Sequence, residues 1–314
     1  MKSPLVLSLA TGAVALGSLV GAANAQEPAP SAPVTGKVIE RGNWDGKLRP
    51  NRGGLPPTWL GLQVKPRAKI CFELRCARYA LRLVKTPVRD GRRAARFEVR
   101  DGDNPFGDAE RAEVQGSAVG KAGSRRWYTW STYFPANSRL GQANENRWLA
   151  FTQWAVERGS APIVMSVYRG NIVLQINEQA SPRKFIGVHR PWAAPVAPLL
   201  GRWIDFALFV RWSPRAATGQ VQLWVDGVQQ QMNWPYGESD PTRFGGLGAS
   251  AFTGRTAVRG GGPTFVRQGI VRAKAFRGRT VVFHDALKTY ATTTTPPPPP
   301  PAPPAPPDPA APPA

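Results

Sequence analysis

The chain has 314 residues and a formal net charge of +21, from 41 Lys and Arg residues against 20 Asp and Glu residues. A surface this basic attracts polyanions, so acidic polysaccharide, nucleic acid and anionic membrane surface are physically admissible partners; a basic surface kept only for solubility is the alternative. The sequence holds two histidines, His189 and His284, which excludes a metal site built from several histidines.

Residues 1–25 have the features of a secretory signal peptide. Lys2 precedes an apolar run over residues 5–20, and Ala23 and Ala25 supply the small residues of a cleavage site. An uncleaved membrane anchor is the alternative, but no strongly charged flank follows the run. No later segment is apolar and long enough to span a bilayer. We therefore predict a secreted or periplasmic protein, taken to be a monomer, for which export favours acidic polysaccharide over a specific nucleic acid as partner.

Two segments flank one predicted domain. Residues 26–37 are rich in Pro, Ala and Ser and predict a flexible leader. Residues 291–314 are dominated by proline, which lacks the amide donor that a sheet needs, and they predict a disordered polyproline II tail. This tail is either a spacer in the envelope or an end without a partner. Residues 38–290 remain for one large β-domain.

Cys71 and Cys76 are the only cysteines of the chain. In an exported protein they predict one disulfide with a short loop, which stabilises little because the closed loop is small. Two cysteines without a supporting histidine cluster make a poor metal site, so no metal and no required cofactor is predicted. A structural calcium ion is compatible with the sequence but is not indicated by it.

Strand patterns recur along the predicted domain, whereas helix patterns are scarce. Short alternating segments separated by Gly and Pro are typical of a β-sandwich or jelly roll. The predicted strands cover residues 94–100, 111–115, 126–134, 148–156, 163–168, 171–177, 264–273 and 279–284.

Residues 201–230 give the strongest local prediction, a β-hairpin. Residues 203–212 are apolar on both alternating faces, whereas residues 221–226 are apolar mainly on one. A strand covered on both faces beside a strand with one wet face predicts two stacked antiparallel sheets.

Three short stretches carry a family resemblance. Residues 109–115 read AERAEVQ, residues 151–155 read FTQWA, and residues 264–272 read TFVRQGIVR. In this order they resemble the jelly-roll polysaccharide lyases, the group that includes heparin lyase I-like, glucuronan lyase and alginate lyase proteins. The resemblance implies an all-β, concanavalin-like jelly-roll sandwich of two antiparallel sheets. It also implies β-elimination of a uronate-containing polysaccharide.

The resemblance implies roles for residues of these three stretches. Arg111 and Gln153 match positions that contact the uronate carboxylate, and Arg267 matches a late-strand lysine. We interpret Glu113 as the orienting partner of an arginine and place Gln268 among the substrate-binding residues. Arginine and amide groups suit this task because both donate hydrogen bonds to a carboxylate. The alternatives are an Arg111 ion pair within the sheet and a Gln153 side chain that faces water.

The departures from the family pattern concern the proton carriers. Ala155 stands where the family often has His, Val271 stands where it has its late-strand Tyr, and the earlier aromatic position is Phe265. None of these three side chains moves a proton, yet a lyase needs a general base and a general acid.

Tyr168 and His189 are therefore the substitute catalytic candidates. Tyr168 is predicted on a strand and His189 on a basic loop, with a packed strand aromatic and a solvent-exposed loop histidine as the respective alternatives. We interpret His284 as structural, hydrogen-bonded to Asp285 or to backbone.

Tryptophans provide further candidates, because sugar rings stack on exposed aromatic faces. Trp154, Trp192 and Trp234 are expected near a groove. The sequence thus supports two functions. The first is an exported polysaccharide lyase, and the second is a catalytically silent protein that binds acidic polysaccharide on the same scaffold.

Overall fold

The computed structural model describes residues 32–42, 44–46, 61–64, 77–103, 109–144, 147–232 and 249–296. The predicted signal peptide, the predicted disulfide between Cys71 and Cys76, and Trp234 lie outside these residues. The predicted limits of the β-domain stay a prediction.

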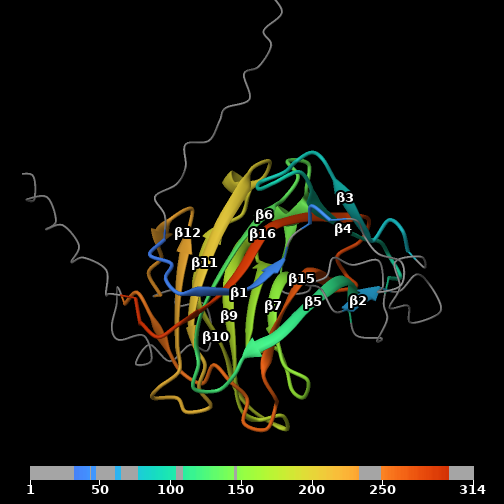
Figure 1. The fold of residues 1–314 in the computed structure, drawn as a ribbon. Coiled ribbons are helices and arrows are strands. Elements are labelled where there is room, and N and C mark those ends of the chain that lie inside the picture. The colour runs from blue at the N-terminus through green and yellow to red at the C-terminus, as the bar shows by residue number, and fades with distance from the viewer. Residues whose placement is uncertain are drawn as a thin grey trace, which may run out of the picture.

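In the described residues the chain forms two antiparallel sheets (Figure 1). The nine-stranded sheet has the order β13-β12-β11-β6-β16-β4-β3, with β1 paired to β16 and β14 paired to β12. Its strands are β1 (Lys37–Gly42), β3 (Leu81–Val84), β4 (Ala94–Val99), β6 (Arg125–Tyr133), β11 (Trp203–Arg211), β12 (Gln220–Val225), β13 (Val228–Gln229), β14 (Phe252–Thr253) and β16 (Thr280–Thr292).

The seven-stranded sheet has the order β10-β9-β8-β7-β15-β5-β2. Its strands are β2 (Gly61–Val64), β5 (Glu110–Gly120), β7 (Leu149–Ala155), β8 (Ile163–Tyr168), β9 (Asn171–Ser181), β10 (Lys184–Pro195) and β15 (Thr264–Arg272). The described residues also include two short 3₁₀ helices, Arg139–Gln142 and Ala197–Leu199, in connections. The predicted all-β class with two antiparallel sheets is confirmed.

The core lies between the two sheets and is rich in aromatic side chains. The Trp154 ring of β7 lies 5.3 Å from the rings of Tyr128 and Trp130 on β6, and Trp130 stacks on Phe206 of β11 at 5.0 Å. These contacts join the inner faces of both sheets, and aromatic side chains bury large apolar areas. The core therefore fixes one face of each sheet and leaves the opposite face available for binding.

The predicted hairpin over residues 201–230 is present as β11 and β12. Leu208 lies opposite Leu223 and Val210 opposite Val221, and all four side chains are buried. The second apolar face of β11 is explained by a separate cluster on the outer side of the sheet, in which Ala207 and Phe209 pack with Trp127 and Trp224.

The sequence missed β10, which was expected to be a loop. Lys184, Gly187, Arg190 and Pro191 interrupt its apolar alternation. β10 is the last strand of the seven-stranded sheet in the described residues, and edge strands tolerate charges and proline because one side of their backbone has no neighbour.

Candidate active site

A groove of about 520 Å³ lies on the outer face of the seven-stranded sheet. Cross-strand register gathers its residues, because side chains that face each other across neighbouring strands share one face of a sheet. Arg111 lies opposite Val271, Val271 opposite Ala150, and Ala150 opposite Ser166. Polar lining side chains come from five strands and one loop: Arg111, Gln153, Ser166, Tyr168, Gln175, Asn177 and Arg190 from the strands, and Ser160 from the loop.

Arg111, Glu113 and Gln153 form a contact cluster at one side of the groove. Gln153 Nε2 donates a hydrogen bond of 2.6 Å to Glu113 Oε1, and Arg111 Nη1 lies 3.9 Å from Glu113 Oε2. The Glu113 side chain is only 3% exposed, while Arg111 and Gln153 line the groove. The sequence placed these three residues in a common site, and Glu113 does contact an arginine, as the interpretation of its orienting role requires.

Gly269 on β15 lies beside this cluster. It lies opposite Glu113 with a φ of +141°, and a Cβ at this position would stand 2.1 Å from the carbonyl oxygen of Ala112. Only glycine fits such a close backbone approach without strain. Glycine at this position therefore lets the backbone of β15 approach that of β5 at Ala112 and Glu113.

Arg267 extends the polar cluster along β15. It lies opposite both Gln115 and Gln153, and its Nη2 donates a hydrogen bond of 3.3 Å to Gln115 Oε1. Burial lowers the pKa of the Arg267 guanidinium, Glu113 raises it, and Arg111 lowers it further. Arg267 adjoins the cluster but is not among the residues that line the groove.

Tyr168 lies at the end of β8 and lines the groove. The guanidinium carbon of Arg190 lies 4.6 Å from the centre of its ring, and that of Arg169 lies 5.5 Å away. Cation–π contacts of this kind hold an aromatic ring in place. The described residues that line the groove include one tyrosine, Tyr168, and no histidine.

His189 does not reach the groove, which corrects the expectation that it is a loop base. It lies on β10 next to Arg190, and because adjacent strand residues face opposite sides, Arg190 enters the groove and His189 points inward. Its Nε2 lies 3.1 Å from Glu178 Oε2, and its ring packs on Phe252 at 5.4 Å. His189 is only 5% exposed, so we interpret it as a structural residue.

Gln268 and Trp154 are also placed away from the groove, by the same alternation. Gln268 follows Arg267 and lies between Val266 and Ile270, both fully buried in the core. Trp154 follows Gln153 and is fully buried between the sheets. Neither side chain is exposed to a ligand, so both are removed from the substrate-binding set.

Trp192 is likewise mostly buried, at 5% exposure, and its Nε1 donates a hydrogen bond to Gln230 Oε1 at 3.0 Å. The expected stacking surface of tryptophans near the groove is therefore wrong for Trp154 and Trp192.

The floor of the groove is apolar where the family resemblance places a tyrosine. Val271 packs in a small cluster with Ala109, Ala150 and Val164. Ala155, at the family's histidine position, lies opposite Phe265 and is 5% exposed. Neither position therefore supplies a proton carrier. Among the described residues that line the groove, Tyr168 of β8 is the candidate for this role.

Arg190 is one of several lining residues that the sequence analysis did not select; others are Trp148, Ser166, Gln175 and Asn177. The period-two pattern of β10 that could have revealed Arg190 is obscured by Gly187 and Pro191 and by three register irregularities against β9. In the described residues, no group of three or more His, Cys, Asp or Glu side chains is placed to hold a metal ion. The described residues also include no helix that is long and apolar enough to cross a membrane.

Comparison with known proteins decides the family. The sequence model of the family described as polysaccharide lyase matches residues 51–288. The chain belongs to the polysaccharide lyase family. This match covers all three motif stretches and the whole groove, so the predicted family is confirmed and the enzyme class is that of the polysaccharide lyases. No curated protein matches the sequence.

Solved structures share the fold of this lyase at low sequence identity. The endo-β-1,4-glucuronan lyase of the fungus Trichoderma reesei is 13% identical with a TM-score of 0.51, over 68% of this chain and 87% of the other. The catalytic domain of a glycoside hydrolase family 131 protein from Coprinopsis cinerea is 11% identical with a TM-score of 0.52, over 83% and 97%. A family 7 alginate lyase, A1-II′, is 11% identical with a TM-score of 0.47, over 75% and 95%. The first two establish a shared jelly-roll fold, and together they show that this fold carries more than one chemistry.

Proposed function

We propose that this protein is an exported lyase that cleaves a uronate-containing polysaccharide by β-elimination in the groove of the seven-stranded sheet. The observation that carries the proposal is that Arg111, Gln153 and Tyr168 line one groove. A carboxylate-binding pair and a proton carrier are the two components that β-elimination of a uronate needs. One of the solved structures that share the fold is a glucuronan lyase, an enzyme of an acidic polysaccharide, which supports the choice of substrate class.

Arg111 and Gln153 would neutralise the substrate carboxylate. Removal of the proton at C5 adds negative charge beside a carboxylate that is already anionic, and prearranged donors stabilise such charge in the transition state. The Gln153 amide has two N–H groups, so its bond to Glu113 leaves one N–H for the substrate. The Arg111 guanidinium has five N–H groups and suits bidentate contact with a carboxylate.

Tyr168 would carry the proton. In its ionised form its oxygen takes the proton from C5, the C4–O4 bond breaks, and a C4–C5 double bond forms. The same hydroxyl then gives a proton to the departing O4, which leaves Tyr168 ionised for the next cycle. Arg190 holds the ring over the groove through its cation–π contact.

The test uses purified protein and a panel of glucuronan, alginate and heparin, with the absorbance of unsaturated uronates as readout. We expect one of these polymers to give product, and Tyr168→Phe to lower kcat by at least roughly 10²-fold, the usual contribution of general acid–base catalysis. Tyr290→Phe is the matched control, because Tyr290 lies on β16 of the other sheet and packs against an outer apolar cluster. Absence of product across the panel and over a broad pH range would contradict the proposal.

Export is a separate part of the proposal, supported by the sequence of residues 1–25. We expect protein expressed with its full sequence to begin at Gln26 once secreted. N-terminal sequencing of the extracellular or periplasmic protein checks this, and an intact N-terminus in the cytoplasm would refute it.

Silent binding of acidic polysaccharide is the second candidate function. The apolar cluster of Val271 with Ala109, Ala150 and Val164 favours it, because this cluster fills the position of the family's tyrosine. Val271→Tyr combined with Ala155→His separates the two functions. A gain of turnover from an inactive wild type supports the silent binder, whereas loss of existing turnover supports the site at Tyr168.

A further inference from the structure

One line of side chains on the nine-stranded sheet has no role in the core or in the groove. Arg96 of β4 lies opposite Phe283 of β16, Phe283 opposite Tyr133 of β6, and Tyr133 opposite Trp203 of β11. These four residues, the aromatic row, face away from the core, since their strand neighbours Phe97, Val282, Thr132 and Ile204 are completely buried. At a strand spacing of about 4.8 Å the row crosses roughly 14 Å of the outer face.

The rings of the aromatic row are in contact with one another. Tyr133 lies 5.5 Å from Phe283 and 5.6 Å from Trp203 between ring centres. Phe283 is 8% exposed, whereas Tyr133 and Trp203 are partly exposed. Phe283 therefore packs against Tyr133 with little exposure of its own, whereas Tyr133 and Trp203 expose apolar surface to a ligand.

A pocket of about 280 Å³ opens at the Arg96 end of the row. Besides Arg96 and Phe283, it is lined by Arg139, Arg277 and Arg279, and the described residues that line it include no carboxylate. Four guanidinium groups around one small pocket create a site for an anion. Arg96, Arg139, Arg277 and Arg279 define this arginine pocket.

Arg96 has an unused donor at this place. Its Nη2 is paired with Glu98 Oε2 at 2.5 Å, whereas its Nη1 is buried without a hydrogen-bond partner in the described structure. A buried donor without a partner costs free energy that a bound anion would recover. Arg139, Arg277 and Arg279 are exposed and thus accessible to a ligand from solution.

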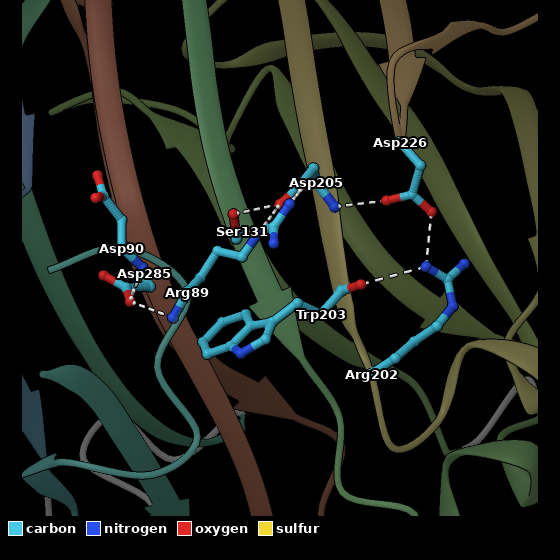
Figure 2. Close-up of polar contacts among 8 residues, drawn as sticks. All are labelled: Arg89, Asp90, Ser131, Arg202, Trp203, Asp205, Asp226 and Asp285. Carbon is cyan, nitrogen blue, oxygen red and sulfur yellow. Dashed lines mark hydrogen bonds and ion pairs between the residues drawn. The ribbon is translucent and has the colours of Figure 1, made fainter. Parts of the chain in front are cut away.

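A polar network fixes the other end of the row (Figure 2). Arg202 Nη1 donates to the carbonyl oxygen of Trp203 at 3.2 Å and to Asp226 Oδ2 at 2.8 Å. Asp226 Oδ1 accepts the backbone N–H of Asp205 at 2.9 Å, and Arg89 forms an ion pair with Asp205. The backbone that follows the Trp203 side chain, from its carbonyl group to the N–H of Asp205, is therefore held in place, which lowers the entropy lost when a ligand binds there.

We propose that the aromatic row and the arginine pocket form a second binding site for an acidic oligosaccharide, on the sheet opposite the groove. Tyr133 and Trp203 contact the apolar faces of sugar rings, and the arginine pocket receives a carboxylate or sulfate group. A glycan is chosen over single-stranded nucleic acid, which also combines aromatic stacking with basic contacts, because the chain belongs to a polysaccharide lyase family. This site does not depend on turnover in the groove.

Calorimetric titration of the full chain with short glucuronan, alginate and heparin oligosaccharides tests the proposal, with a neutral cello-oligosaccharide as the control ligand. We expect wild-type protein to bind an acidic oligosaccharide at two sites. Trp203→Ala and Arg279→Ala should each weaken one of them by roughly tenfold, the effect of one lost strong contact. Trp203→Phe should retain most of the binding because it keeps an aromatic face.

Two further variants make the result specific. Arg259→Ala removes an equal charge from an exposed position outside the groove and the arginine pocket, and should bind as wild type. Arg111→Ala should weaken only the other site, so loss of groove binding and loss of this site are distinguishable.

Arg279 is exposed, so its variant is expected to fold; thermal unfolding checks Trp203→Ala. Wild-type affinity at both sites in Trp203→Ala and Arg279→Ala, a single site abolished by Arg111→Ala, or tighter binding of single-stranded DNA than of any glycan would each overturn the proposal.

Discussion

Glu113 is the residue that contacts both proposed carboxylate-binding side chains. Its two oxygens face Gln153 Nε2 and Arg111 Nη1 from a nearly buried position. It does not line the groove, so its role in the proposed reaction is that of a positioning residue.

We predict that Glu113→Ala lowers kcat by roughly tenfold to a hundredfold, because small displacements of catalytic donors have effects of this size. Glu113→Gln should lose less, since its amide oxygen still accepts the bond from Gln153. The measurement is kcat and KM of both variants beside their thermal unfolding. Equal kcat in wild type and Glu113→Ala would contradict the positioning role.

His284 is the buried titratable residue with the clearest effect on pH stability. Burial lowers its pKa to about 3, although a hydrogen-bonding contact with the carbonyl oxygen of Gly269 acts in the opposite direction. Its other ring nitrogen lies 3.2 Å from Thr132 Oγ1. The structural interpretation from the sequence agrees with this environment, with backbone rather than Asp285 as a partner.

Below about pH 6.5 the unfolded chain therefore binds a proton at His284 that the folded chain does not bind. The contribution of neutral His284 to the free energy of unfolding is fully present above pH 6.5 and is lost as the pH falls toward about 3. We predict that the free energy of unfolding of wild type falls relative to that of His284→Gln between pH 7.5 and pH 4, as measured by urea titration. A difference between the two proteins that does not change with pH would refute this.

At the scale of elements, β15 carries a backbone position that only glycine fits without strain. The positive φ of Gly269 and its approach to Ala112 leave no room for a side chain. We predict that Gly269→Ala lowers the free energy of unfolding by about 1–3 kcal/mol through backbone strain, and lowers activity as β15 shifts.

Gly141→Ala is the control, because Gly141 has an ordinary φ and a Cβ there meets nothing within 4 Å. Urea titration of both variants measures the difference. If Gly269→Ala were as stable as Gly141→Ala, the close approach at β15 would be refuted.

The alternation of strands explains both what the sequence predicted and what it did not. The motif stretches supplied Arg111, Gln153 and Arg267 on the correct strands. Two of the wrong assignments concern the neighbour of a residue on the outer face of the sheet: Trp154 beside Gln153, and Gln268 beside Arg267. Trp192 is also buried, but neither of its sequence neighbours lines the groove.

His189 beside Arg190 follows the same rule, which could not be applied because β10 was not recognised as a strand. A period of two sends only one member of each pair to a given face. Cross-strand register, which sets Tyr168 in the same groove as Arg111, depends on pairings far apart in sequence and on bulges. Neither the long-range strand pairings nor the bulges can be predicted from a single amino-acid sequence.

At the scale of the whole molecule, the formal net charge of +21 acts together with the local sites. Exposed charges attract a polyanion over distances that salt shortens, with a Debye length of about 10 Å at 0.1 M ionic strength. The groove contributes Arg111 and Arg190, and the arginine pocket lies on the opposite sheet.

We predict that binding of an acidic polysaccharide weakens by roughly tenfold or more when NaCl rises from about 0.05 M to about 0.5 M. A neutral polysaccharide should show no comparable dependence. Binding assays in a salt series check this, and a salt-independent affinity for the acidic polymer would contradict the electrostatic contribution.

The central claim is that the groove of the seven-stranded sheet holds a uronate for β-elimination, and a structure of Tyr168→Phe with a bound oligouronate tests it most directly. We predict a sugar carboxylate within hydrogen-bond distance of Arg111 and Gln153, with C5 of the same sugar facing the substituted ring. An oligouronate bound only at the aromatic row, or bound in the groove with its carboxylate away from Arg111 and Gln153, would contradict the claim.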